Sequence, residues 1–323
     1  MAHPEATQLS SLLANQPIPP LAEEEFRLFQ ALVLRESGIH LGEKNRAMLV
    51  SRLWKRLRAL SLKSFAAYYR NVKKDPDEMV RMLDCLCTNE TRFFREPAAF
   101  DCLRQMIFPQ WRAAASEGKR GSTLRVWSAA CSTGEEAYTL AMILLSEFPR
   151  SDGWKVEVFG TDLSTKALDR AVTGIWPAER VVGVPVEYQH RFLLKGFGPE
   201  KGKFKIAEEL KRVVQFQRVN LTRDSLPISG PFDLIFCRNV LIYFDWQIKL
   251  QVVNRLGKLL APDGYLFLGH AESLHGVTDK LESVAPKTFE TWKPSTRGGA
   301  LCVLQRRNSD SLQAPSRKPA KPF

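Results

Sequence analysis

The sequence VWSAACSTGEEAYTLAM, residues 126–142, decides the fold of this 323-residue chain. It contains the end of a short apolar run, LRVWS (124–128), then a loop of small and polar residues, then an amphipathic segment. A buried strand that leads through a tight loop into a helix is the opening of a βα unit. The stretch therefore predicts an α/β domain.

Further apolar runs along the chain repeat this pattern. Amphipathic segments separate most of the runs VEVFG (156–160), VVQFQ (213–217), FDLIFC (232–237) and GYLFLG (264–269). Alternating strands and helices predict a mostly parallel sheet that is covered on both faces. The interval 174–212 differs, because its glycines and alternating pattern predict a small antiparallel insert. A last strand is expected near residues 301–304.

The residues before this domain have helical periodicity and no strand-like alternation. Leu49, Leu53, Leu57 and Leu60 fall on one helical stripe. Arg52, Lys55 and Arg58 fall away from that stripe, so one helix presents a basic face. We therefore divide the chain into a flexible leader (1–20), a helical domain (21–88), an α/β domain (89–293) that contains the insert (174–212), and a basic, mostly disordered tail (294–323).

Composition limits the class of protein. The chain has 44% hydrophobic residues, 47 Lys+Arg against 35 Asp+Glu, and six cysteines. No apolar run approaches the ~20 residues that a membrane-spanning helix needs, and no signal peptide is evident. We expect a cytoplasmic protein with free thiols. Cys85 and Cys87 form a lone C-x-C pair, so no metal site is predicted.

The formal charge of +12 is unevenly distributed. Residues 44–74 contain ten basic side chains and no acid, and the tail from Pro294 has a net charge of +5. Subtracting both segments, 12 − 10 − 5, leaves −3 for the remainder. The chain outside these two segments therefore has no net positive charge, which disfavours a nucleic-acid enzyme.

Polar residues follow four of the predicted strands. They lie in AACSTGEE (129–136), TDLS (161–164), NLT (220–222) and RNVLIYF (238–244). Because ligands of open α/β sheets bind at the carboxyl ends of the strands, these loops predict one binding site.

The acids in these loops restrict the ligand. Glu135 and Glu136 begin the helix after the first loop, so a diphosphate there would meet two carboxylates. Asp162 ends the second strand, where an acid can accept both hydroxyls of a ribose. The pattern favours a nucleoside with a cationic, phosphate-free tail, such as S-adenosylmethionine. The alternative is an ordinary turn with solvated acids.

The sequence resembles a known family, the chemotaxis-receptor methyltransferases called CheR. The resemblance rests on NETRFFRE (89–96), VWSAACSTGEEAYTLAM (126–142), TDLSTKALDRA (161–171), GPFDLIFCRNVLIYFD (230–245) and APDGYLFLGHAESL (261–274). It implies an N-terminal all-helical domain, a Rossmann-like S-adenosylmethionine-dependent methyltransferase domain and a small antiparallel β-subdomain inserted in it. It also implies protein-glutamate O-methyltransferase activity.

The resemblance also implies roles for individual residues. In the family pattern, the cofactor and active site are lined by Asn89, Thr91 and Arg95, and Tyr243 faces Arg95. The methionine end of the cofactor lies near Glu135 or Glu136, the ribose is bound by Asp162, and the adenine lies beside Asn220 and Leu221. The fourth strand is followed by Arg238 and Asn239. The sequence does not distinguish Glu135 from Glu136. Cys131 departs from the family pattern, which has an alanine at this position.

The chemistry of the reactants indicates the mechanism. A glutamate side chain is ionised at neutral pH, so methyl transfer to it needs no general base. Arg95 can pair with the carboxylate, and the Tyr243 hydroxyl can add a hydrogen bond. His270 is therefore expected to orient a loop rather than to act as a base.

The expected partner is the helical cytoplasmic signalling domain of a chemotaxis receptor, which is an acidic bundle in this family. Arg52, Lys55 and Arg58 form the expected docking face, although a solvated helix face would look the same. A receptor C-terminal peptide is a further possible ligand of the β-subdomain. We expect a monomer that binds no nucleic acid and does not insert into the membrane. The alternatives are a nucleic-acid methyltransferase and a non-enzymatic adaptor that retains the cofactor fold.

Overall fold

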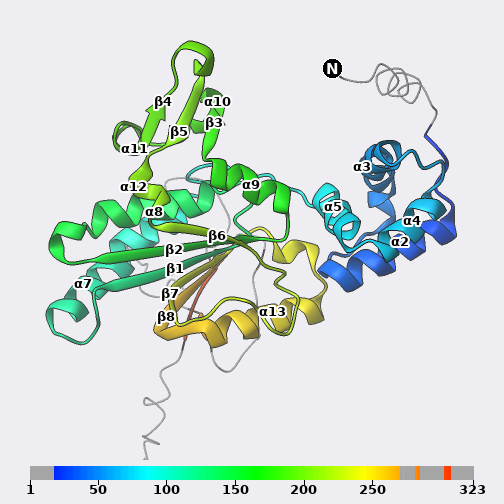
Figure 1. Cartoon of the computed structure of the whole chain (residues 1–323). Coiled ribbons are helices and arrows are strands. Elements are labelled where there is room, and N and C mark those ends of the chain that lie inside the picture. Colours follow the sequence, from blue (N-terminus) through cyan, green and yellow to red (C-terminus); the bar gives the residue numbers. More distant parts are fainter. Residues whose placement is uncertain (1–17, 270–271, 273–280, 284–301, 307–323) are drawn as a thin grey trace, which may run out of the picture.

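The computed structural model describes residues 18–269, 272, 281–283 and 302–306 (Figure 1). Most of the expected leader, His270, and the expected basic tail apart from 302–306 lie outside the described residues. No helix in the described ranges combines the length and the apolar character that a bilayer crossing requires.

The N-terminal part is a group of helices with its own apolar core. The helices are α2 (Glu23–Ser37), α3 (Arg46–Ala59), α4 (Phe65–Lys74) and α5 (Pro76–Leu86), and a short 3-10 turn (Glu43–Asn45) precedes α3. Phe29, Leu53 and Tyr68 are fully buried between them. The helix α5 begins where Asp75 accepts hydrogen bonds from the backbone of Asp77 and Glu78, which is the usual role of an N-cap residue.

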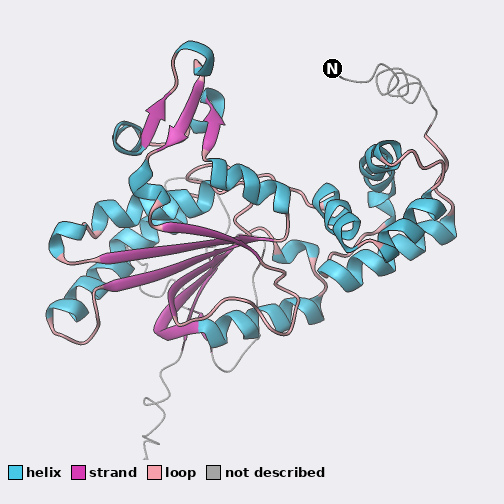
Figure 2. Ribbon diagram, viewed as in Figure 1, coloured by secondary structure: helices cyan, strands magenta, loops and turns pink. Residues whose placement is uncertain are grey.

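The α/β part is built on a sheet with seven strands among the described residues, in the order β6-β2-β1-β7-β8-β10-β9 (Figure 2). The strands are β1 (Thr123–Ala129), β2 (Lys155–Asp162), β6 (Val214–Arg218), β7 (Phe232–Cys237), β8 (Leu260–Leu268), β9 (Leu281–Ser283) and β10 (Cys302–Arg306). The first five in this order run parallel, whereas β10 is antiparallel to both of its neighbours. The predicted mostly parallel sheet and the predicted last strand are confirmed.

Alternate side chains of the central strands enter two separate cores. On one face, Val126 and Phe236 pack against the segment formed by α6 (Ala98–Cys102), a π-helical turn (Leu103–Ile107) and α7 (Phe108–Ser116), and against α8 (Glu135–Glu147) and α9 (Thr165–Thr173). On the other face, Trp127 and Ile235 pack with α13 (Trp246–Leu259). The continuous apolar runs arise because both faces of the sheet are buried.

The insert forms a small sheet of its own above the α8 side of the molecule (Figure 1). Its elements are β3 (Ile175–Pro177), α10 (Ala178–Val181), α11 (Val186–Phe192), β4 (Leu193–Lys195), β5 (Lys203–Ile206) and α12 (Glu208–Lys211). The strands are antiparallel in the order β3-β5-β4. The predicted antiparallel insert is confirmed, and it contains three short helices that the alternation did not indicate.

Candidate active site

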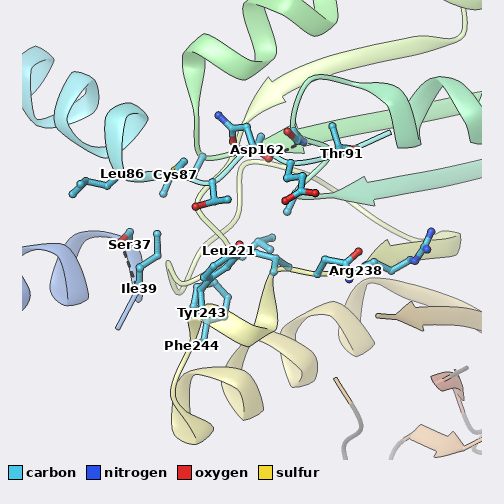
Figure 3. A pocket seen from close by; sticks show the side chains of 18 of the residues that line it. Ser37, Ile39, Leu86, Cys87, Thr91, Asp162, Leu221, Arg238, Tyr243 and Phe244 are labelled. Carbon is cyan, nitrogen blue, oxygen red and sulfur yellow. Dashed lines mark hydrogen bonds between the residues drawn. The ribbon is translucent and has the colours of Figure 1, made fainter. Parts of the chain in front are cut away.

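A pocket lies where β1 separates the two halves of the sheet. The chain proceeds from β1 to β2 on one side, while β7 pairs with β1 on the other, so the strand order reverses here. The ends of α2 and α5 close the pocket from the side of the N-terminal helices (Figure 3). Among the expected site residues, those that line the pocket are Asn89, Thr91, Arg95, Glu136, Asp162, Asn220, Leu221, Arg238, Asn239 and Tyr243.

The loops around this pocket have an unusual backbone. The described residues include seven non-glycine residues with positive φ, and five of them, Phe94, Glu96, Ala130, Ser132 and Asn239, lie in these loops. Such conformations cost about 1–3 kcal/mol each and persist where the surrounding structure imposes them, often at functional sites. The strain therefore marks the same place as the pocket.

Two carboxylates point toward the pocket, of which Asp162 is buried and Glu136 is partly buried, with 16% of its side chain exposed. The carboxylate of Glu136 accepts hydrogen bonds from the Ser128 hydroxyl at 2.7 Å and from Arg238 at 3.2 Å. That of Asp162 accepts the backbone N–H groups of Ser132 at 2.8 Å and Ser164 at 2.9 Å. Burial raises the pKa of both carboxyl groups, even though these donors and Arg238 act in the opposite direction. Burial thus destabilises the ionised forms of both carboxyl groups at the pocket.

The structure separates Glu135 from Glu136, which the sequence did not. Glu135 is fully buried but is not among the residues that line the pocket. Its carboxylate accepts hydrogen bonds from the Thr133 hydroxyl, the Trp176 indole and Arg180 instead. Of the two acids, Glu136 is the one at the pocket.

The segment 89–96 crosses from α5 to α6 and forms one wall. The Asn89 amide donates to the Ser164 hydroxyl at 3.4 Å, which joins this wall to the loop after β2. The Arg95 guanidinium donates to the Glu90 carbonyl at 2.9 Å, and a third of its side chain is exposed. Arg95 therefore offers a partly solvated cation at the pocket.

Arg238, at the end of β7, is buried and holds that wall in place. Its guanidinium donates to the backbone carbonyl of Arg95 at 2.7 Å, to Glu96 at 2.8 Å and to Glu136 at 3.2 Å. The Asn239 amide also donates to Glu96, at 3.2 Å. Both residues therefore connect the loop after β7 to the segment 89–96.

The opposite side of the pocket is more apolar. Tyr243 and Phe244 lie there, across from Asp162 and Thr91 (Figure 3), and Leu221 is buried at the pocket wall. The carbonyl of Tyr243 accepts the backbone N–H of His40 at 3.0 Å, which ties the loop to the N-terminal helices.

The side chain of Asn220 is largely occupied by contacts within the protein. Its amide donates to the Glu36 carbonyl at 2.7 Å, and its oxygen accepts from the backbone of Thr222 at 3.0 Å. Asn220 therefore holds the end of α2 against the loop after β6, although it also lines the pocket.

Sequence reasoning missed Glu272. This acid is only 4% exposed, and its carboxylate accepts the backbone N–H groups of Gly269 at 2.8 Å, Asn239 at 2.9 Å and Ile242 at 3.3 Å. Burial raises its pKa, against the effect of these donors. It supports the loop that carries Asn239 and Tyr243. An acid four residues beyond the end of a buried strand was the available signal.

The structure also shows that one of the three residues of the expected basic face, Arg52, is engaged in contacts within the protein. Arg52 donates to the carbonyls of Leu86 at 2.8 Å and Cys87 at 3.1 Å, at the end of α5. It therefore stabilises the pocket-facing end of that helix. Lys55 is exposed and Arg58 is half-buried.

Cys131 and Cys237 are fully buried free thiols, and burial raises the pKa of both well above the usual range. Neither is therefore a nucleophile at neutral pH. The described part of the chain contains no group of three side chains that would hold a metal ion.

The pocket fits a cationic ligand with hydroxyl groups. Its two carboxylates, Asp162 and Glu136, would be stabilised by a positive charge, and a diphosphate would add to the repulsion. The buried Ser132 hydroxyl, which lines the pocket, has no hydrogen-bond partner within the described residues. An unpaired buried hydroxyl is expected to meet a polar group of a ligand.

Comparison with known proteins identifies the family. Residues 24–87 match the model described as "CheR methyltransferase, all-alpha domain", and residues 89–289 match "CheR methyltransferase, SAM binding domain". The chain is 37% identical to chemotaxis protein methyltransferase 2 of Pseudomonas aeruginosa, over 82% of this chain and 92% of that protein. It is 36% identical to the chemotaxis protein methyltransferase of Escherichia coli, over 82% of this chain and 90% of that protein.

These matches cover both structural parts described above, and the pocket lies between them. The charge of the pocket agrees with S-adenosylmethionine, the cofactor of this domain family. The chain belongs to the CheR methyltransferase family, and it is an S-adenosylmethionine-dependent methyltransferase.

Proposed function

We propose that this protein methylates glutamate side chains on the helical cytoplasmic domain of a chemotaxis receptor. The observation that carries the proposal is the placement of Arg95, a partly exposed cation, at the pocket that contains Glu136 and Asp162. A cationic cofactor suits the two acids, and an anionic substrate suits Arg95. Homologues named chemotaxis protein methyltransferases support the same substrate class.

We assign the cofactor-binding residues by their chemistry. Asp162 has acceptor capacity left for ribose hydroxyls, since each of its oxygens has one backbone donor. Glu136 is the partner for the amino group of the methionine moiety, and Leu221 packs beside the adenine. The segment with Asn89 and Thr91 closes the site. Arg238 and Asn239 act through Glu96 and Glu136.

The protein contributes positioning rather than proton transfer. The cofactor supplies an electrophilic methyl group on a sulfonium centre, and the substrate carboxylate is ionised at neutral pH. Arg95 orients that carboxylate and neutralises it, and the Tyr243 hydroxyl contributes a second contact. Holding two reactants at near-attack geometry is worth about 7–11 kcal/mol of a barrier.

Receptor docking involves two surfaces in this proposal. Lys55 and Arg58 on α3 attract an acidic helix bundle, while Arg52 contributes to the fold as well. In the insert, β4 is an edge strand; Leu194 within it is 54% exposed, and Phe197 just after it is 87% exposed. An extended receptor peptide can add a strand to such an edge.

The deciding experiment is incubation with a radiolabelled methyl donor and a panel of receptor signalling domains. Label that is released by mild alkali is expected, because carboxyl methyl esters hydrolyse there. Alkali-stable label, or label on nucleic acid, would contradict the proposal. Binding of S-adenosylhomocysteine with no methyl transfer to any receptor would indicate an adaptor instead.

Reversing the charge of Lys55 and Arg58 to glutamate should slow receptor methylation mainly at low salt. The reason is that exposed charges steer association and are screened by ions. The rates of the double variant and the wild type should converge as salt is increased. The matched control reverses the charge of two other basic side chains, Lys119 and Lys155, which lie on the α/β part. Equal rates at every salt concentration would reject docking on this face.

The affinity for S-adenosylhomocysteine should fall as the pH is lowered from neutral into the acidic range. Burial raises the pKa of Glu136 and Asp162, so these groups are protonated at a higher pH than ordinary carboxyls. The ionised form of Glu136 attracts the ligand's ammonium group, and the ionised form of Asp162 is the better acceptor for the ribose hydroxyls, so binding lowers both pKa values and releases protons. Calorimetry in buffers with different heats of ionisation measures this release. Affinity that does not change with pH, with no proton released, would contradict the role of these acids.

A further inference from the structure

We propose that Arg180, in the inserted subdomain, is a positioning residue for methyl transfer. It connects the insert to the segment 89–96, which forms a wall of the cofactor pocket. The inference rests on the proposed function of that pocket. It gives the insert a direct influence on the active site, in addition to any contact with a receptor.

Glu135 is the centre of this connection. Its carboxylate is fully buried at the first residue of α8. The Thr133 hydroxyl donates to one oxygen at 2.5 Å, while the Trp176 indole N–H at 3.0 Å and Arg180 at 2.6 Å donate to the other. Trp176 and Arg180 both belong to the insert. The buried charge is compensated largely by the insert.

The same Arg180 nitrogen reaches the pocket wall. Its Nη2 atom donates to the backbone carbonyl of Thr91 at 2.8 Å, in addition to its contact with Glu135. Thr91 lines the pocket, four residues before Arg95. One guanidinium group of the insert therefore fixes both the start of α8 and the backbone of the segment 89–96.

Aromatic contacts reinforce this attachment. The ring of Phe93 meets the edge of Trp176 with centroids 5.1 Å apart, and the ring of Phe94 stacks on Tyr188 at 5.4 Å. From the other side, Arg238 donates to the carbonyl of Arg95. The segment is thus held between two arginines, of which Arg238 belongs to the sheet and Arg180 to the insert.

Loss of Arg180 should therefore affect the site more than the fold. Glu135 would keep its hydrogen bonds from Thr133 and Trp176, and the Phe93–Trp176 contact would remain. The carbonyl of Thr91 would lose its partner, and the wall that carries Asn89, Thr91 and Arg95 would keep only aromatic contacts to the insert. Both cofactor affinity and the orientation of Arg95 should suffer.

The test compares Arg180→Ala and Arg180→Lys with the wild type and with Arg191→Ala. Arg191 is the matched control, because it belongs to the same insert, is 46% exposed and pairs with Glu209 away from the segment 89–96. Calorimetry measures Kd for S-adenosylhomocysteine, and receptor methylation at saturating cofactor measures kcat. Thermal unfolding is followed in parallel.

For Arg180→Ala we expect about a tenfold rise in Kd, which corresponds to about 1.4 kcal/mol, and a loss of kcat that saturating cofactor does not restore. Arg180→Lys should lie between this variant and the wild type, since lysine keeps the charge but not the planar fork. Arg191→Ala should leave Kd and kcat unchanged.

The outcomes are distinguishable. If the wild type binds S-adenosylhomocysteine and both Arg180 variants match Arg191→Ala in Kd and kcat, the inference is wrong, even if their Tm is lower. If Arg180→Ala does not fold, Arg180→Lys decides by the same comparison. If the wild type itself fails to bind S-adenosylhomocysteine, the proposed cofactor pocket is wrong and the inference falls with it.

Discussion

Replacement of Arg95 by alanine should lower kcat for receptor methylation by about 100-fold, the usual scale for losing one donor that orients a reacting oxyanion. Arg95 is a partly exposed cation at the pocket, and it contacts the Glu90 carbonyl at 2.9 Å and the Glu96 carboxylate at 3.9 Å. The variant should therefore remain folded. Steady-state kinetics at saturating S-adenosylmethionine measures the effect.

Two comparisons make this prediction specific to Arg95. Arg95→Lys should recover only part of the rate, because an ammonium group cannot make the forked contact with a carboxylate. Arg27→Ala, on the exposed face of α2, should behave as the wild type. Full turnover by Arg95→Ala would show that the substrate carboxylate is oriented by another group.

Asp162→Ala should weaken binding of S-adenosylhomocysteine by about 100-fold or more, equivalent to about 2.7 kcal/mol. Two effects combine in this variant. The ribose would lose a charged acceptor, and the backbone N–H groups of Ser132 and Ser164 would lose the carboxylate that holds their loops together. Hydrogen bonds to charged groups contribute about 1.5–3 kcal/mol each.

Calorimetric titration at neutral pH provides the measurement for Asp162→Ala. Asp169→Ala is the matched control, because Asp169 is an exposed acid on the helix α9 that follows the same strand. Asp162→Asn should bind more tightly than Asp162→Ala, since its amide oxygen can still accept one backbone hydrogen bond. An affinity for Asp162→Ala within threefold of the wild type would falsify the role of this acid.

The strands were predictable because they are buried on both faces. LRVWS (124–128) and FDLIFC (232–237) lie within β1 and β7, and the pocket lies at the carboxyl ends that the sequence indicated. Local composition determines such features. Once the strands are placed side by side, the polar residues of the loops that follow them lie together at one edge of the sheet.

Side-chain direction was less predictable, because it depends on residues far along the chain. Glu135 and Glu136 are neighbours at the start of α8, and Glu135 turns away from the pocket because Trp176 and Arg180 supply donors there. Arg52 lies away from the apolar stripe of α3, as predicted, yet it reaches carbonyls at the end of α5. The hydrogen-bond partners of Glu135 and Arg52 depend on how the helices and strands pack, which the local sequence does not determine.

Glu272 illustrates a further limit. Its partners are backbone N–H groups of the loop after β7, and sequence patterns do not indicate which backbone groups lack a partner. The neighbouring His270 is the more conspicuous residue of this stretch, because histidine is a frequent acid–base catalyst. Buried acids that bind loop backbone are a second class of residue to consider after a strand end.

The position of β10 affects how the chain acquires this sheet during synthesis. Because β10 lies between β8 and β9, this strand, the last in sequence among the described residues, must enter after its two neighbours have been made. Until the ribosome has released residue 306, β8 therefore presents an open edge, and open edges invite pairing with other chains. Nascent chains arrested before this point should depend on chaperones, although most of the pocket-lining segments have already been translated.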